Sequence, residues 1–229
     1  MKVELLQYTK GADQLCGMAA ANCYHSSNFQ KALEHSAGAG HESVIEHTIY
    51  TFRISGVSRC LLAQLTRHRL CSFSVESQRY VKMESHQPFV CPQTIAHSEL
   101  IEKYVAFCRE AINLYQEMLD AGIPAEDARY SIPQAVTTTI IMSCNARELK
   151  HILGLRCCNR AQWEIKRLAD KMYTLVYPTA PAIFGKAGPG CVNGRGCHEA
   201  RPCGSPRKLE EWQGKKGSEE DGSSSFEEK

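Results

Sequence analysis

The sequence predicts an α/β protein, a single compact domain in which a mixed β-sheet packs with several long helices. Of the 229 residues, 43% are hydrophobic, which is enough to build one sizeable core. Residues 49–54 and 136–144 are rich in β-branched and aromatic side chains and therefore indicate strands. Residues 98–121 carry apolar side chains at three- and four-residue steps, which indicates a long helix ending near Gly122.

The first half of the chain is predicted to alternate strands with helices. Residues 1–8 indicate a first strand, because apolar side chains are concentrated there. Residues 28–37 contain helix-forming side chains, and that helix is expected to end near Gly38. A further helix is expected over residues 58–67, and its end would present the polar segment that follows.

The second half is predicted to be mainly helical after the strand at 136–144. A short helix is expected over residues 124–132. Asn145 offers an N-cap for the next helix, with Glu148 in capping-box register, and Gly154 is expected to end that helix. The last long helix is expected over residues 159–176.

The main domain is expected over residues 1–184, followed by a tail over residues 185–229. The tail first contains Cys, Gly and Pro and then becomes charged. Beyond Ser205 it is rich in Lys, Glu, Gly and Ser and has few apolar residues, so we expect that part to be disordered.

The composition favours a cytoplasmic protein with neither a membrane nor a nucleic acid as partner. The net charge is only +2, whereas nucleic-acid binders usually carry a concentrated basic stripe. Residues 1–11 lack the apolar centre of a signal peptide, and no stretch approaches the roughly 20 apolar residues of a membrane helix. The 12 cysteines are therefore expected to be mostly reduced thiols.

The most informative segment contains Arg67-His68-Arg69, then seven residues, then Ser77. So many donors in a short span indicate an anionic ligand, and planar guanidinium groups suit phosphate better than lysine does. A solvated helix face is the other interpretation of such a charge cluster.

Two groups of residues invite a metal site, but neither has a suitable spacing. Around His41 and His47, a zinc-hydrolase motif would need histidine at Ile45 or at Ser43. In the tail no Cys-x-x-Cys pair is present. The tail residues concerned are Cys191, Cys197, His198 and Cys203. We therefore predict no metal.

The Arg-His-Arg segment resembles the signature of the flavin-dependent thymidylate synthases. Residues 40–47 are similar to the Gly-His-x-Ser/Thr-x-x-Glu-His segment of that family. Asn145-Ala146-Arg147, and Arg156 followed by Ala-Gln-Trp-Glu-Ile at 161–165, are similar to its closing segment. Together these matches span most of residues 40–177.

The resemblance implies an enzyme that methylates dUMP to dTMP. FAD would be the cofactor, 5,10-methylenetetrahydrofolate would supply the one-carbon unit, and NADPH would reduce the flavin. It further implies a homotetramer whose active sites are shared between subunits.

The resemblance also implies roles for individual residues. Flavin-binding positions would be Ser43, Arg67, His68, Arg69, Asn145, Arg147 and His151. Substrate-binding positions would be Gln64, Arg67, Glu76, Ser77, Gln78, Arg79, Arg129 and Arg156. His41 would lie where folate and flavin meet, and from the sequence a structural role suits it equally well.

Arg156 would have the catalytic role. A fixed cation beside the uracil ring stabilises the negative charge that develops as the ring becomes nucleophilic. Without the family match, a salt bridge from Arg156 to Glu164 would be the preferred interpretation. Val75 and Glu76 depart from some family members, which place a carboxylate one residue earlier, so either residue could face uracil.

Two other classes of function stay open at this point. A non-catalytic nucleotide- or RNA-binding module could use the same arginines. A zinc hydrolase could use the two histidines at 41 and 47 together with the tail cysteines.

Overall fold

A computed structural model describes residues 1–208, apart from the side-chain environment of Gly38. Its centre is a four-stranded sheet in the order β1-β2-β4-β3. The strands are β1 (Lys2–Tyr8), β2 (Ile49–Ser58), β3 (Ser72–Val75) and β4 (Thr137–Asn145). All three strand pairings are antiparallel, so the prediction of a mixed sheet is wrong. Which strands pair depends on contacts between distant segments, and composition does not carry that information.

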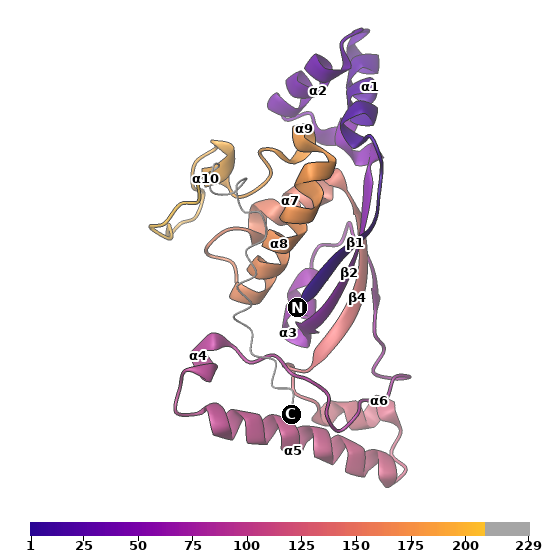
Figure 1. Cartoon of the computed structure of the whole chain (residues 1–229), viewed down its shortest axis with the longest axis vertical. Helices are drawn as coiled ribbons and strands as arrows, with labels where there is room; N and C mark the ends of the chain where they lie inside the picture. The colour runs from indigo at the N-terminus through magenta and orange to yellow at the C-terminus, as the bar shows by residue number, and fades with distance from the viewer. Residues whose placement is uncertain (209–229) are drawn as a thin grey trace.

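The helices flank the sheet and extend beyond both of its ends (Figure 1). The α-helices are α1 (Ala12–Tyr24), α2 (Phe29–Gly38), α3 (Arg59–Leu65), α4 (Gln93–Ala96), α5 (Ile101–Asp120), α6 (Ala125–Ala128), α7 (Ala146–Arg156), α8 (Trp163–Val176), α9 (Pro181–Phe184) and α10 (Gly190–Asn193). Short 3-10 helices are η1 (Glu42–His47), η2 (Arg129–Ser131) and η3 (Tyr177–Thr179). No helix among the described residues is both long and apolar enough to cross a membrane.

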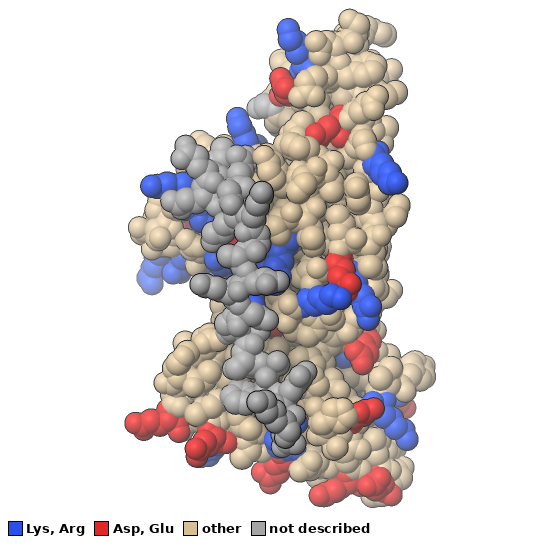
Figure 2. Space-filling model, in the orientation of Figure 1, with Lys and Arg blue, Asp and Glu red and all other residues tan. Residues whose placement is uncertain are grey.

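The main core lies between the sheet and the helices α7 and α8. Tyr50, Phe52 and Ile54 of β2 are fully buried there, as are Met142 of β4 and Met172 of α8. Helix α5 packs at one end of the molecule over smaller apolar clusters of its own (Figure 1). Figure 2 shows acidic side chains gathered at this end, whereas both signs of charge are interspersed over the rest of that face.

Several helix boundaries differ from the sequence-based expectation. Helix α1 has no counterpart among the predicted elements, because its Ala-rich sequence lacks a clear apolar stripe. It packs closely on α2, and a Cβ at Gly17 would lie only 2.8 Å from the backbone oxygen of Phe29. Helix α7 continues past Gly154 to Arg156, and helix α8 begins at Trp163 rather than at residue 159.

The segment after residue 184 packs on the body of the protein. Ala187 and Val192 belong to the main core. Within the part expected to be disordered, Arg207 forms a paired contact with Asp170 of α8, at 2.7 and 2.6 Å, and the backbone oxygen of Ser205 accepts from Asn159. Residues 205–208 are therefore held against the body of the protein. Residues 209–229, which are also expected to be disordered, lie outside the described part of the chain.

Candidate active site

The signature segment is positioned by a buried carboxylate at the start of α3. The Ser58 hydroxyl caps α3 by accepting from the Leu61 backbone N–H at 3.0 Å. Glu164 of α8 in turn accepts from the Ser58 backbone N–H at 2.8 Å and from its hydroxyl at 2.5 Å. Glu164 is therefore bound to Ser58, and its expected alternative role as the salt-bridge partner of Arg156 is wrong. The capped helix delivers the Arg-His-Arg residues at its end.

His68 is turned into the protein, whereas the two arginines beside it are exposed. The residue is only 5% exposed. Arg156, the last residue of α7, donates from Nε to His68 Nε2 at 3.0 Å. On the other side of the ring, Nδ1 lies 3.4 Å from Oε1 of the buried Glu148. His151 packs edge-on against His68, with 5.9 Å between ring centroids. Folding thus brings together His68, His151 and Arg156, which the family resemblance places in the site.

The electrostatics of this cluster keep His68 neutral. Burial, Arg156 and His151 lower the pKa of His68 to about 4. Burial also lowers the pKa of Arg156, and the nearby Arg67 lowers it further. Burial raises the pKa of Glu148, and His151 acts in the opposite direction. An arginine stays protonated in proteins, so Arg156 is a half-buried cation beside a neutral imidazole.

Among the described residues, Arg156 donates a hydrogen bond through Nε, and its two terminal nitrogens have no partner. A guanidinium held through Nε keeps its other donors available for a ligand. The cluster can therefore stabilise negative charge on a group placed beside it.

A second, more exposed group of cations surrounds Glu126. Arg79 donates from Nε to the Glu126 carboxylate at 2.8 Å, and Arg129 donates from Nε to the Glu126 backbone oxygen at 2.9 Å. Both side chains of the Arg79 pair are about half exposed, at 53% and 47%. Two expected substrate ligands, from segments far apart in sequence, thus meet at one acidic residue.

Arg59 adds an unexpected guanidinium next to this group. It donates to the Glu76 backbone oxygen at 2.9 Å, while its buried Nε has no partner among the described residues. Burial lowers the pKa of Arg59, Glu76 opposes that shift and Arg129 adds to it. Arg59 therefore holds the Glu76 backbone in place and lies close to Arg129.

Helix α7 organises the expected flavin side of the site. Asn145 accepts from the Glu148 backbone N–H at 2.9 Å, which confirms the predicted N-cap. Arg147 pairs with Glu46 of η1 at 2.5 Å, and Lys150 pairs with Glu42 of η1 at 2.7 Å. The η1 turn thus supplies carboxylates to the cations at the start of this helix.

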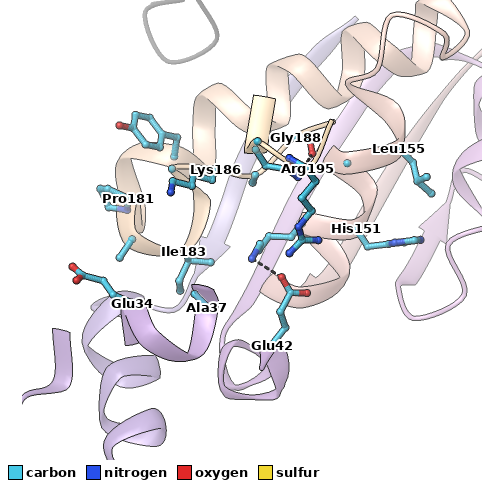
Figure 3. A pocket seen from close by; sticks show the side chains of 18 residues that line it. Glu34, Ala37, Glu42, His151, Leu155, Pro181, Ile183, Lys186, Gly188 and Arg195 are labelled. Atoms are coloured by element: carbon cyan, nitrogen blue, oxygen red, sulfur yellow. Dashed lines mark hydrogen bonds and ion pairs between the residues drawn. The ribbon is translucent and has the colours of Figure 1, made fainter. Parts of the chain in front are cut away.

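A cavity of about 930 Å³ opens beside this helix. Its lining includes His151, the Lys150–Glu42 pair, Lys186 and Arg195. Figure 3 shows the Glu42 ion pair beside Arg195, with the His151 side chain directed away from that pair. His151 also packs on His68, so this residue contacts both the cavity and the buried cluster.

The other expected site residues do not join these clusters. Ser43 and Arg69 are exposed, and Gln64, Ser77 and Gln78 are partly exposed. The Ser77 hydroxyl accepts from the Arg79 backbone N–H at 3.3 Å. His41 has a local partner, because its Nδ1 lies 3.1 Å from the Tyr24 hydroxyl.

Sequence reasoning missed the site neighbours Glu148, Arg59 and Glu126. Glu148 was assigned to a capping box, and its backbone N–H does take part in the cap, but its carboxylate faces His68. The one available signal was the spacing of Glu148 and His151, which are three residues apart and share a helix face. Arg59 gave no signal, because the Glu76 backbone oxygen that it binds lies 17 positions away, and Glu126 gave none, because the Arg79 side chain that its carboxylate binds lies 47 positions away.

The tail cysteines surround a smaller cavity of about 400 Å³. Cys158, Cys191, Cys197 and Cys203 line it, together with His198. Within residues 1–208, however, no three His, Cys, Asp or Glu side chains are grouped so that they could hold a metal ion.

Comparison with known proteins identifies relatives over nearly the whole chain. The family described as "Thymidylate synthase complementing protein" matches residues 4–182. The flavin-dependent thymidylate synthase of Geobacter sulfurreducens is 41% identical, over 91% of this chain and 96% of that protein. The enzyme of the same name from Thermococcus onnurineus is 40% identical, over 93% of this chain and 96% of that protein.

Solved structures with the same fold include two that contain ligands. The flavin-dependent thymidylate synthase of Helicobacter pylori, complexed with FAD and dUMP, matches with a TM-score of 0.69 and 28% identity, over 82% of this chain and all of that chain. The UMP/dUMP methylase PolB of Streptomyces cacaoi, bound with 5-Br dUMP, matches with a TM-score of 0.71 over 80% of this chain and 92% of that chain. At 24% identity, the second match concerns the fold alone.

Proposed function

The chain belongs to the flavin-dependent thymidylate synthase family, and we propose that it converts dUMP to dTMP. The observation that carries the proposal is the half-buried Arg156, held through Nε by His68 beside the family signature. We propose that 5,10-methylenetetrahydrofolate supplies the carbon and NADPH supplies the reducing equivalents.

Arg156 would act on the uracil ring of dUMP. The ring must accept electron density before it can attack a one-carbon donor, and a cation at its polar edge stabilises that charge. Because Arg156 is partly desolvated, its effect on a nearby charge is stronger than in water. No side-chain nucleophile is required in this scheme, since the polarised substrate is itself the nucleophile.

The phosphate of dUMP would be held by Ser77, Gln78, Arg79 and Arg129, with Gln64, Arg67 and Glu76 completing the nucleotide site. Arg79 and Arg129 both contact Glu126, so a phosphate would compete with that residue for the Arg79 guanidinium. The orphaned Nε of the neighbouring Arg59 adds to the positive potential there. This local excess of donors fits a dianionic ligand.

The residues expected to bind FAD also fit that cofactor. Its pyrophosphate is an anion, and Arg67, Arg69 and Arg147 present guanidinium groups, while Asn145 begins α7 and His151 lines the neighbouring cavity. Ser43 would add a hydroxyl donor. Once reduced by NADPH, the bound flavin would supply the hydride that completes the methyl group. The protein's own residues bind, orient and polarise the ligands.

We further propose a homotetramer with shared active sites, a main domain over residues 1–184 and a cytoplasmic location. The tetramer is supported by the exposure of Ser43, Arg69 and Arg147 on the single chain. Ligand groups that are open on one copy can be covered by another copy.

The test is purification under native conditions followed by spectroscopy and product analysis. We expect bound FAD, or its ready uptake, together with NADPH oxidation that responds to dUMP and folate-dependent formation of dTMP. A colourless protein that takes up no FAD and instead binds RNA with steep salt dependence would refute the proposal and favour a nucleic-acid-binding module.

A further inference from the structure

Glu148 is a buried carboxylate whose side chain takes no part in the helix cap. It is 7% exposed, and its backbone N–H alone makes the cap with Asn145. A capping-box carboxylate would turn back toward the Asn145 backbone, whereas the Glu148 carboxylate lies 3.4 Å from His68 Nδ1. Burial of a carboxylate is costly unless a donor compensates for the lost solvent, and His68 is the donor in reach.

The contact to Arg156 shows which nitrogen of His68 carries the proton. Arg156 Nε always bears a hydrogen and donates it to His68 Nε2, so Nε2 must have a free lone pair. The neutral ring then carries its hydrogen on Nδ1, the nitrogen that faces Glu148. The charged or titratable groups facing the ring are Glu148, His151 and Arg156, and Arg67 acts on Arg156 from the signature segment.

The opposite tautomer would place two N–H donors against each other. Both His68 Nε2 and Arg156 Nε would then carry hydrogens, and the buried contact would be lost. The carboxylate of Glu148 prevents this by favouring a hydrogen on Nδ1.

We propose that Glu148 is a positioning residue for Arg156 and acts through His68. It fixes the Nδ1–H form of the imidazole, so that Nε2 holds the guanidinium of Arg156 by its Nε–H and the terminal nitrogens stay available to an anionic ring edge. The identity of that ring as uracil rests on the proposed function. The tautomer of His68 and its dependence on Glu148 do not rest on the proposed function.

The first measurement is independent of activity. Side-chain 15N spectra of histidine-labelled protein, with the His68 signals assigned by loss in His68→Gln, report which ring nitrogen is protonated. We expect Nδ1–H in the native protein and loss of this single form in Glu148→Leu. A native protein with Nε2–H, or a Glu148→Leu variant with unchanged His68 signals, would overturn the proposal.

The second measurement is dUMP affinity of the FAD-loaded protein by calorimetry. We expect Glu148→Leu to weaken binding about tenfold with unchanged FAD content, because Arg156 loses its fixed orientation. Glu148→Gln keeps an oxygen acceptor for Nδ1–H and should stay within about threefold of the native value. If Glu148→Leu does not fold, Glu148→Gln takes its place: retention of the single Nδ1–H form would support the proposal, and a mixture of His68 tautomers or a loss of dUMP affinity beyond about threefold would overturn it.

A double-mutant cycle separates positioning from general destabilisation. In an Arg156→Ala background, Glu148→Leu should weaken dUMP binding no further, since its effect passes through Arg156. Asp13→Asn is the matched control, because Asp13 is also a partly buried carboxylate but accepts from the backbone N–H groups of Ala182 and Ile183, and its effect should be the same in both backgrounds. Additive effects of Glu148→Leu and Arg156→Ala would contradict the proposal. Absence of dUMP binding in the native protein would instead refute the proposed function.

Discussion

The two cationic regions of the site hold their arginines in opposite ways. Arg156 is half-buried, and its contact is a neutral imidazole that is itself 5% exposed. Arg79 is about half exposed, and its contact is the carboxylate of Glu126, which is also about half exposed. One arginine is therefore oriented without being neutralised, and the other is neutralised by a group that water also reaches.

The difference indicates what each region can do. A neutral partner leaves the charge of Arg156 available, and the low dielectric around it strengthens any interaction with a ligand. A surface ion pair contributes only about 0–1 kcal/mol, so a phosphate can replace Glu126 at little cost. The buried region suits charge stabilisation during a reaction, and the exposed region suits reversible capture of a substrate.

The largest effect is expected from Arg156→Ala. Loss of an oriented charge at a developing anion commonly costs about 3 kcal/mol, so turnover should fall at least about 100-fold. Steady-state assays at saturating dUMP check this, with circular dichroism and FAD content as controls for folding. Near-native turnover would show that Arg156 does not stabilise charge during the reaction, and the proposed difference between the two regions would be wrong.

A smaller effect is expected from Arg79→Ala. Losing one of several phosphate ligands should raise the dissociation constant for dUMP about tenfold and leave turnover at saturation nearly unchanged. The binding loss should shrink as salt increases, because the group is exposed. An unaltered dissociation constant would show that this region does not bind the phosphate.

Arg207 offers an intermediate case between a buried and an exposed contact. Its side chain is 13% exposed and donates through two nitrogens to the carboxylate of Asp170, which is 30% exposed. Arg207→Ala should lower the free energy of unfolding by about 1 kcal/mol, more than a surface pair and less than a fully buried one. Thermal unfolding measures this change, and Lys2→Ala, which removes the exposed Lys2–Glu4 pair, is the control. Equal effects of the two variants would contradict the ranking.

The smallest effect concerns pH. The pKa of His68 is about 4 in the folded protein against 6.5 for a free side chain, so the folded state binds fewer protons there than the unfolded state. Its contribution to stability is therefore complete above pH 6.5 and is lost as the pH falls toward 4. The raised pKa of Glu148 acts in the opposite direction, which keeps the net slope well below the roughly 1.4 kcal/mol per pH unit of one proton.

Denaturant titrations between pH 7 and 4 measure that slope. In His68→Gln, which has no titrating ring, the loss of stability on acidification should be reduced relative to the native protein. An unchanged pH dependence would mean that His68 is not the buried neutral group described above.

Local features of the site were predictable because their partners are close in sequence. The N-cap at Asn145 uses a backbone N–H three residues later, and the periodicity of residues 98–121 reflects a single helix face. The Arg-His-Arg segment likewise indicated an anionic ligand by residue type alone. These features depend only on residues that are close together in the chain, so they can be read from the sequence.

Local signals failed where burial competed with them. Gly154 was expected to end α7, since glycine costs about 1 kcal/mol inside a helix. The helix nevertheless continues to Arg156, because the contact of Arg156 with His68 and the fully buried Cys157 hold the last turn against the core. A buried side chain of this size and a hydrogen bond each contribute on the order of 1 kcal/mol, so together they outweigh the local preference.

The chain by itself therefore determined the residue types of the site, the signature that marks its family and most of the helices. Only the tertiary structure decided that the sheet is antiparallel, that His68 meets Arg156 across 88 positions of sequence, and that Glu148 faces the same ring. Such contacts depend on which faces are buried together. A buried polar group must find its partner in space, and that partner can come from any part of the sequence.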